Sequence, residues 1–309
     1  MRLRIFDILG AKTLREGEGC LEGYIEELSL YADGLLRSQS AGYVHSVYRK
    51  TVNLSVGGRL LSLQPADSPL SPISLITNAS EGELRELRLT AGEPVWIGKD
   101  RIQTKEAGFF AGRAVRRELL LAKAAPSAQI ERLEEDLCGL LKKEGTGTFC
   151  RAMLEEKEEG TDLLLKTVKD RLADARARLG NGMWEEAAES LAALVGLGIG
   201  LTPGGDDFLC GVLAGIRLGG RADQPFFRAL HATVSRKLDQ TNDISREFLK
   251  CALEGQFGQF VHRFYKGSTE EIFAEAKKIG HSSGMDTLCG ILYALWLREW
   301  LRDERGKAM

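Results

Sequence analysis

Glycine is concentrated in one short segment of the chain. Nine glycines fall between positions 196 and 220, in a protein of 309 residues with 35 glycines in all. The densest part reads GLGIGLTPGGDDFLCG, from Gly196 to Gly211, and helix-like apolar sequence stands on both sides of it. Glycine interrupts helices and allows backbone conformations that other residues rarely adopt. The segment therefore predicts a helix, a glycine-rich loop and a second helix.

This loop matches neither of the common nucleotide-binding motifs. A dinucleotide-binding loop follows a strand and reads G-x-G-x-x-G, but here Pro203 stands three positions after Gly200 and no strand is expected before it. A P-loop ends in Gly-Lys-Ser or Gly-Lys-Thr, whereas this loop continues as Gly-Gly-Asp. We expect no bound nucleotide.

The loop does have the residues of an anion-binding helix start. Thr202 can cap a helix whose first residue is Pro203, which would leave the amides of Gly204 and Gly205 unshielded at the positive end of the helix. We count these residues and Gly200 as candidate anion-binding groups.

Two aspartates stand in the first turn of the same predicted helix, and three roles are open to them. Asp206 and Asp207 can stabilise the helix start, hold a divalent cation that bridges to an anionic ligand, or accept a proton from a substrate nitrogen. Adjacent helical positions point in directions about 100° apart. We expect Asp207 to face the site and Asp206 to cap or orient the loop.

A second segment repeats the first in outline. Gly205–Gly211 and Gly284–Gly290 lie 79 positions apart and match at five of seven places, which makes Asp286 the counterpart of Asp207. Ser282 and Ser283 precede the second copy and are candidate hydroxyl donors to an anion, or simple caps. The repeat predicts two helix starts that converge on one ligand, with independent helix caps as the alternative.

The rest of the chain divides into a strand-rich part and a helical part. Short, often alternating apolar segments separated by turn residues stand between positions 41 and about 103, which is typical of a small sheet or barrel. From about Gly112 the apolar residues recur at helical spacing. We predict an α+β fold: a mostly antiparallel β-sheet or barrel domain in residues 1–110 and a helical domain in residues 111–309. The expected strands are 43–56, 59–63, 73–77, 83–89 and 95–97, and the expected helices are a stretch from 112 broken at Pro126, then 161–179, 183–195, 205–218, 225–239, 243–254, 269–279 and 284–302.

Two polar residues in the predicted strands are further candidates. His45 stands in the sequence VHSV and Asn53 in VNL. Each can be a hydrogen-bonded structural residue or a ligand-binding one.

Composition excludes several classes of protein. The 42 Lys and Arg residues balance 44 Asp and Glu residues, which argues against nucleic-acid binding and against a basic membrane anchor. No apolar stretch is long enough for a membrane helix, and the N-terminus lacks the features of a signal peptide. The six cysteines form no C-x-x-C pair and no Cys/His cluster, so we expect no zinc and no disulfide framework, and a cytoplasmic protein.

Four segments together resemble one known family. The chain resembles the AllH subunit family of oxamate carbamoyltransferase, formerly described as carboxylases of unknown function. The similar segments are, in chain order, HSVYRKTVNL, GLGIGLTPGGDDFLCG, TNDISREFL and IGHSSGMDTLCGI. The resemblance runs from about His45 to Leu295. Gly204 stands where many members have serine, so this chain lacks that hydroxyl.

The resemblance implies an activity and partners. It implies carbamoyl transfer between oxamate and phosphate in purine (allantoin) degradation, by a complex with partner subunits and with the help of Mg²⁺ or Mn²⁺. A non-catalytic subunit that binds a small anion or serves assembly is the alternative, and a carboxylase-type enzyme is a weaker one. The candidate site residues are Asp207 and Asp286 (catalytic), Asp206 and Asp207 (metal), and Gly200, Thr202, Gly204, Gly205, Ser282, Ser283, Gly284, His45 and Asn53 (substrate or anion binding).

Overall fold

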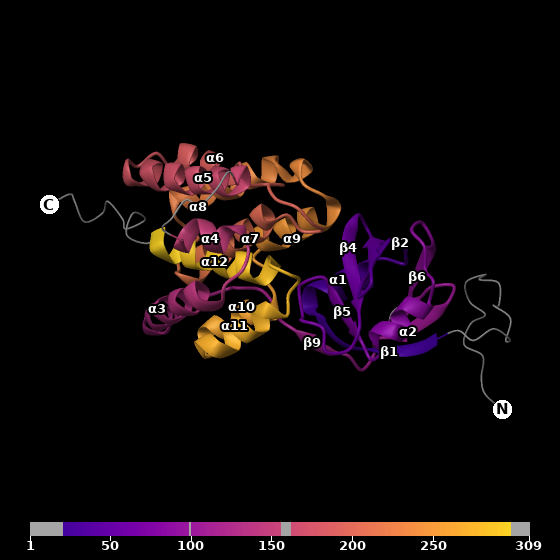
Figure 1. The fold of residues 1–309 in the computed structure, drawn as a ribbon. Coiled ribbons are helices and arrows are strands. Elements are labelled where there is room, and N and C mark those ends of the chain that lie inside the picture. Colours follow the sequence, from indigo (N-terminus) through magenta and orange to yellow (C-terminus); the bar gives the residue numbers. More distant parts are fainter. Residues whose placement is uncertain (1–20, 99, 156–161, 298–309) are drawn as a thin grey trace, which may run out of the picture.

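The computed structural model of the protein describes residues 21–98, 100–155 and 162–297. A mixed β-barrel occupies residues 21–117, and a helical region follows it (Figure 1). This confirms the predicted α+β class and the order of its two parts. None of the described helices has the length and apolar character that a membrane crossing requires.

Among the described residues, eight strands close into the barrel, and a ninth pairs with the end of the first strand. The order is β5-β4-β3-β2-β6-β7-β8-β1, and the ring closes because β1 also pairs with β5. Most pairs are antiparallel, but β4–β5, β1–β8 and β1–β9 are parallel. The strands are β1 (Leu21–Ser29), β2 (Ala41–Val47), β3 (Val52–Val56), β4 (Arg59–Gln64), β5 (Ser74–Thr77), β6 (Pro94–Gly98), β7 (Arg101–Gln103), β8 (Ala107–Phe110) and β9 (Val115–Arg117).

The barrel encloses its own apolar core. Alternate residues of the strands point inward, and Leu28, Val44, Leu54 and Phe109 are fully buried there. Two short helices, α1 (Leu30–Ser38) and α2 (Glu81–Glu86), add leucine side chains to the same core.

In the helical region, two helices lie at the centre. Figure 1 shows α12 crossing the middle of the region, with α5, α6 and α8 on one side and α3, α10 and α11 on the other. Helix α7 packs along α12 and is apolar on nearly all sides, as expected of a helix that is buried all round. The helices are α3 (Ser127–Glu144), α4 (Thr148–Leu154), α5 (Leu163–Gly180), α6 (Trp184–Ala192), α7 (Gly204–Leu218), α8 (Pro225–Arg236), α9 (Asp243–Leu253), α10 (Gln259–His262), α11 (Thr269–Lys277) and α12 (Ser283–Trp296), with 3₁₀ turns at Leu238–Gln240 and Arg263–Tyr265.

Helices α7 and α12 cross with their backbones in contact. A Cβ atom added to Gly211 would lie 2.0 Å from the Thr287 carbonyl oxygen, and one added to Gly290 would lie 2.0 Å from the Phe208 carbonyl oxygen. The two contacts are reciprocal and join positions related by the 79-residue repeat. The sequence repeat therefore corresponds to an approximate two-fold arrangement of α7 and α12.

The approximate symmetry extends to the helix that precedes each member of the pair. A Cβ atom on Gly205 would lie 2.0 Å from the Leu194 carbonyl oxygen just after α6, and one on Gly284 would lie 2.0 Å from the Ala276 carbonyl oxygen in α11. Each unit is thus a helix, a loop and a central helix whose second residue must be glycine.

Two local predictions were wrong. Residues 83–89 were expected to form a strand, but Ser80 and Glu83 make a capping box that starts helix α2. Residues 112–125 were expected to be helical, but they contain β9 and an extended segment, and helix α3 begins only at Ser127. The short strand β9 forms because it pairs with the edge of β1 beyond the end of β8. The division into domains at residue 110 stays a prediction.

A cluster of charged residues joins the barrel to helix α9. Arg59 at the start of β4 donates hydrogen bonds to Glu247 at 2.6 Å and Glu254 at 3.0 Å. Tyr31 donates to Glu247 at 3.1 Å. Glu247 is only 2% exposed, and a buried carboxylate requires such partners. The cluster therefore fixes α9 against the barrel.

The helix crossing leads to a first prediction. We expect Gly290→Ala to lower the free energy of unfolding by about 1–3 kcal/mol, because the new methyl group forces α7 and α12 apart. The matched control is Gly139→Ala on α3, where no atom lies within 4 Å of the added Cβ and alanine favours the helix by up to about 1 kcal/mol. Urea denaturation measures both; equal stability of the Gly290 variant and the parent would contradict the backbone contact.

Candidate functional site

The two central helices bring two aspartates together at their first turns. Asp207 and Asp286 occupy equivalent positions of the repeat, and they are close enough for the charge of Asp286 to raise the pKa of Asp207. The loops before the helices also meet, since the hydroxyls of Thr202 and Ser283 lie 2.8 Å apart in a hydrogen bond. The structure thus brings together the two helix starts that the repeat predicts to converge.

Asp286 is buried between two glycines. It is 2% exposed, and a Cβ atom on Gly147 would lie 2.9 Å from its Oδ1, while one on Gly204 would lie 3.0 Å from its Oδ2. Burial raises the pKa of Asp286 to about 7, although the Ser282 hydroxyl and the Phe149 amide act to lower it. Its Oδ1 has no hydrogen-bond partner within the described residues.

Asp207 is half-buried, and its pKa is shifted further than that of Asp286. Burial raises its pKa to about 8, hydrogen bonds from Ser283 and Thr202 act to lower it, and the charge of Asp286 raises it further. Its Oδ2 is buried and lacks a partner in the described part of the chain. Because two interacting carboxyls both titrate near neutral pH, the pair can donate and accept a proton there.

Asp206 has a different function from its neighbour. It is 1% exposed, and its carboxylate accepts hydrogen bonds from the Gly196 amide at 2.8 Å and the Thr241 hydroxyl at 2.5 Å. Burial raises the pKa of this carboxyl. Asp206 therefore fastens the glycine loop to the turn before α9, while Asp207 lies within the influence of the charge of Asp286.

The predicted anion-binding helix start offers fewer free amides than the sequence suggests. Helix α7 begins at Gly204 with no side-chain cap, because the Thr202 hydroxyl pairs with Ser283 instead. The Gly205 amide donates to the Leu197 carbonyl at 2.9 Å. The Gly204 amide has no acceptor among the described residues, so it is the amide of this pair that a ligand can use.

The second helix start is arranged in the same way. The Gly284 amide donates to the Ile279 carbonyl at 3.1 Å, so Gly284 serves packing against α11 and offers no free amide. Ser282 is the N-cap residue of α12 but makes no capping hydrogen bond. The simple-cap interpretation therefore fails for Ser282.

The loop between α6 and α7 is shaped by glycines with positive φ. Gly196, Gly198 and Gly200 have φ values of 72°, 130° and 105°, a region that favours glycine. Gly200 has open space around its α-carbon, and its neighbour Ile199 is 90% exposed. The tip of the loop therefore projects from the protein.

The aspartate pair offers the oxygen donors that Mg²⁺ and Mn²⁺ prefer. Mg²⁺ often binds through one or two carboxylates and completes its shell with substrate phosphate and water. Asp207 and Asp286 each present a buried oxygen without a partner in the described structure, whereas both oxygens of Asp206 are engaged. The described residues contain no group of three or more His, Cys, Asp or Glu side chains arranged for a metal. The pair fits a cation that takes its other ligands from substrate or water.

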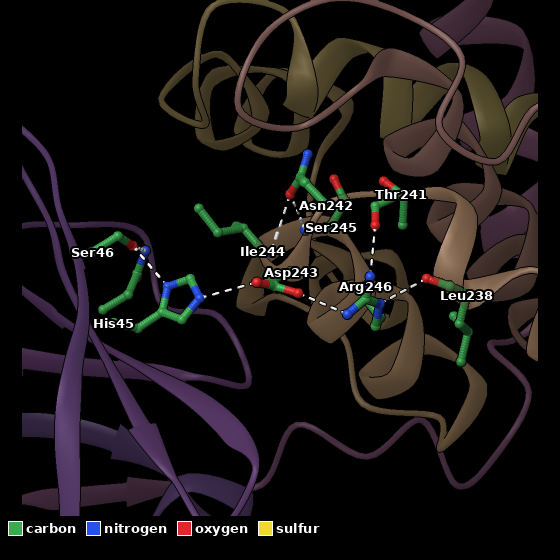
Figure 2. A network of polar contacts seen from close by, with 10 residues as sticks. His45, Ser46, Leu238, Thr241, Asn242, Asp243, Ile244, Ser245 and Arg246 are labelled. Carbon is green, nitrogen blue, oxygen red and sulfur yellow. Dashed lines mark hydrogen bonds and ion pairs between the residues drawn. The ribbon is translucent and has the colours of Figure 1, made fainter. Parts of the chain in front are cut away.

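His45 and Asn53 meet in a second polar network, shown in part in Figure 2. His45 bonds to Ser46 through Nδ1 at 3.0 Å and to Asp243 of α9 through Nε2 at 3.2 Å. Asn53 donates to the Ser46 hydroxyl at 3.1 Å. A bulge in β2 between Val44 and Ser46 turns these neighbouring side chains toward each other.

This network does not contact the aspartate pair directly, but it reaches the glycine loop. The side chain of Asn242 caps α9 by accepting from the amides of Ile244 and Ser245. Its amide group donates to the Leu201 carbonyl at 3.0 Å. His45 and Asn53 thus lie at the junction between the barrel and the helix that holds the loop.

The raised pKa values predict a pH dependence of stability. Carboxyls with folded pKa values of about 7 and 8 and unfolded values near 3.9 stabilise the fold below about pH 4. This contribution is lost progressively as pH rises from about 4 through the folded pKa values of about 7 and 8, by up to about 1.4 kcal/mol per pH unit for each group. In urea denaturation at pH 5 to 8, the double variant Asp207→Asn, Asp286→Asn should lose this decline. The control variant Asp170→Asn, at an exposed position on α5, should show the same decline as the parent. The same slope in the double variant would contradict raised pKa values at Asp207 and Asp286.

Comparison with known families matches two parts of the chain. Residues 26–115 match the model described as the AllH family N-terminal domain, and residues 194–295 match the model described as oxamate carbamoyltransferase subunit AllH. No solved structure matches the chain. Because the two family matches cover most of the chain and include both the barrel and the paired helix starts, the chain belongs to the AllH family.

Proposed function

We propose that this chain contributes the aspartate-pair site of an oxamate carbamoyltransferase. The observation that carries the proposal is the pair Asp207 and Asp286, two carboxyls that each have a buried oxygen and pKa values raised to about 8 and about 7 at paired helix starts. The family description names such an enzyme and calls its member a subunit. Buried carboxyls that titrate near neutral pH are frequent in sites of proton transfer.

The reaction requires a proton transfer at a nitrogen atom. In the catabolic direction a phosphate oxygen attacks the carbamoyl carbon of oxalurate, the bond from that carbon to the oxamate nitrogen breaks, and the nitrogen takes up a proton. Carbamoyl phosphate and oxamate are the products. In the reverse direction the oxamate nitrogen loses that proton as it attacks the carbamoyl carbon.

Asp207 is suited to exchange this proton. Its pKa of about 8 keeps it mostly protonated at neutral pH, so it acts as the general acid when the carbon–nitrogen bond breaks. Asp286, with the lower pKa of about 7, is then the carboxylate of the pair and accepts hydrogen bonds from the carbamoyl NH₂ group.

Neutral donors at the site suit the anionic end of the substrate. The hydroxyls of Thr202 and Ser283 and the amide of Gly204 lie around the pair and can donate to a carboxylate or phosphate oxygen. A divalent cation held by the Asp286 carboxylate, with Asp207 still protonated, would neutralise phosphate and polarise the carbamoyl carbonyl.

A non-catalytic role in binding or assembly is the second candidate. It is favoured by the charges at the site. The pKa values of Asp207 and Asp286 are set mainly by burial and by neighbouring hydroxyls, an amide and other carboxylates, and no Lys or Arg of the described residues is among these main influences. Calorimetry of the isolated chain with carbamoyl phosphate, oxamate and Mg²⁺ separates the two. No binding by the chain alone, with full rescue of its partners' activity by the Asp207→Asn variant, would favour the assembly role.

The main prediction concerns activity in the assembled enzyme. We expect Asp207→Asn to lower the rate of carbamoyl phosphate formation from oxalurate about 10²–10⁴-fold, because the amide cannot exchange the proton. Asp286→Asn should lower it as well, with a rise in KM for oxalurate. The exposed Asp170→Asn serves as the control. Undiminished rates in folded Asp207 and Asp286 variants would exclude this site.

The pair also predicts the pH profile of the rate. The rate of phosphorolysis should fall as pH rises through about 8, where Asp207 loses its proton, and as pH falls below about 7, where Asp286 gains one. The Asp286→Asn variant should lose the acidic limb and keep the basic one. Steady-state rates between pH 5.5 and 9.5 test this; a profile that Asp286→Asn leaves unaltered would contradict the assignment.

A further inference from the structure

His45 and Ser46 follow each other in strand β2, yet their side chains meet. Consecutive side chains of a regular strand point to opposite faces of the sheet. Here a bulge between Val44 and Ser46 breaks the regular pairing of β2 with β3, and His45 Nδ1 lies 3.0 Å from the Ser46 hydroxyl oxygen. Bulges are frequent beside active sites, where they re-aim a side chain. This one brings an imidazole to a hydroxyl.

The neighbours of this pair determine the direction of its hydrogen bonds. The Asp243 carboxylate can only accept, so His45 Nε2, which lies 3.2 Å from it, carries the hydrogen of the neutral imidazole. His45 Nδ1 is then an acceptor, and the Ser46 hydroxyl donates to it. The Asn53 amide donates to the Ser46 oxygen at 3.1 Å, which leaves the hydroxyl hydrogen for His45.

Buried residues hold Asn53 in this orientation, while the reactive pair stays accessible. The Asn53 Oδ1 atom accepts from the Ser62 hydroxyl at 2.6 Å, so the NH₂ group of Asn53 faces Ser46. Asn53 is 3% exposed and Ser62 is 5% exposed. In contrast, the His45 side chain is 24% exposed, and Ser46 is half-buried. A small molecule can therefore reach the hydroxyl and the imidazole, and the residues behind them are fixed.

A hydroxyl, an imidazole and a carboxylate in this order are the parts of an activated nucleophile. A hydroxyl attacks more readily when a base takes its proton, and a third group holds the base in the correct orientation. His45 Nδ1 is placed to take the Ser46 proton, and Asp243 holds the opposite nitrogen of the ring. Arg246 donates to the second oxygen of Asp243 at 2.7 Å, which fixes the carboxylate from the other side (Figure 2).

We propose that Ser46 and His45 form a second reactive site, which takes carbonyl compounds with a good leaving group, such as activated esters. The Ser46 oxygen forms a bond to the carbonyl carbon while its proton moves to His45 Nδ1. The bond from that carbon to the leaving group then breaks, and the leaving group takes the bonding electrons and the proton from His45. Water hydrolyses the resulting acyl-serine, with His45 again as the base.

Asn53 supplies a donor for the negative charge that develops in this reaction. Its NH₂ group has two hydrogens, and Ser46 is the acceptor recorded for it among the described residues. The other hydrogen can donate to the carbonyl oxygen, as side-chain amides do in oxyanion holes. Neither carboxyl of the aspartate pair takes part, so this reaction goes beyond the proposed function and does not depend on it.

The full-length chain mixed with p-nitrophenyl acetate tests the nucleophile. We expect rapid release of p-nitrophenolate, and mass spectrometry of the acid-quenched chain should find the acetyl group on Ser46. Ser46→Ala should abolish the rapid release. The matched control Ser68→Ala should keep it, because the Ser68 hydroxyl is also half-buried but donates to the Pro65 carbonyl. Rapid release that Ser46→Ala leaves unchanged, no release above buffer, or an acetyl group found only on other residues would overturn the proposal.

The base and the residue that positions it are tested in the same assay. His45→Gln should slow the release about 10²–10⁴-fold, because glutamine cannot take the proton. Asp243→Asn should lower kcat with little change in KM, because asparagine can donate to Nε2 and place the ring hydrogen on Nδ1. Melting temperatures equal to that of the parent exclude misfolding. Parent rates in a folded His45→Gln chain would overturn the role of His45, and a parent kcat in Asp243→Asn would overturn that of Asp243.

Discussion

The backbone contact between α7 and α12 is the constraint on which the site depends. The helices can approach this closely only because Gly211 and Gly290 have no side chains at the crossing. At a wider separation, the first turns would not meet and Asp207 and Asp286 would be open to water. Since interiors are packed without spare room, one missing methyl group on each helix decides the environment of two carboxyls several residues away.

Removing a carboxylate from water costs free energy of folding, so a carboxyl that is left without partners needs an explanation. A carboxylate taken out of water without a cation loses hydration that the protein must replace. For Asp206 the protein does replace it, with the Gly196 amide and the Thr241 hydroxyl. For Asp207 and Asp286 an oxygen on each is left without a partner among the described residues. The two adjacent residues thus differ. Asp206 holds the loop through both of its oxygens, whereas Asp207 keeps one oxygen without a partner in the described structure.

Much of this arrangement could be predicted from the sequence because it depends on local pattern. The repeat of Gly205–Gly211 at Gly284–Gly290 indicated that two helix starts converge, and the helical spacing located most helices to within a few residues. The start of α2 is local as well, since Ser80 and Glu83 form its capping box, although residues 83–89 were predicted as a strand. The free Gly205 amide was a wrong prediction because its acceptor, the Leu197 carbonyl, becomes available only when the loop folds back.

Other parts of the site depend on contacts between distant segments and have no local signal. Gly147 and Phe149 approach Asp286 because α4 packs against α12, and nothing in their own sequence indicates it. The closure of the barrel by β1 and β5 is equally non-local. So is the partner of His45, since Asp243 lies 198 residues away in the chain.

These distant contacts connect the barrel to the glycine loop of the candidate site. The barrel holds α9 through Arg59 and Glu247 and touches its first residue, Asp243, through His45. The next residue back, Asn242, holds the Leu201 carbonyl. The position of the glycine loop therefore depends on the barrel, although no described barrel residue is among the groups that most affect the pKa values of Asp207 and Asp286. The helix crossing that places the aspartate pair is made within the helical region, whereas the edge of the loop is held through α9, which the barrel contacts.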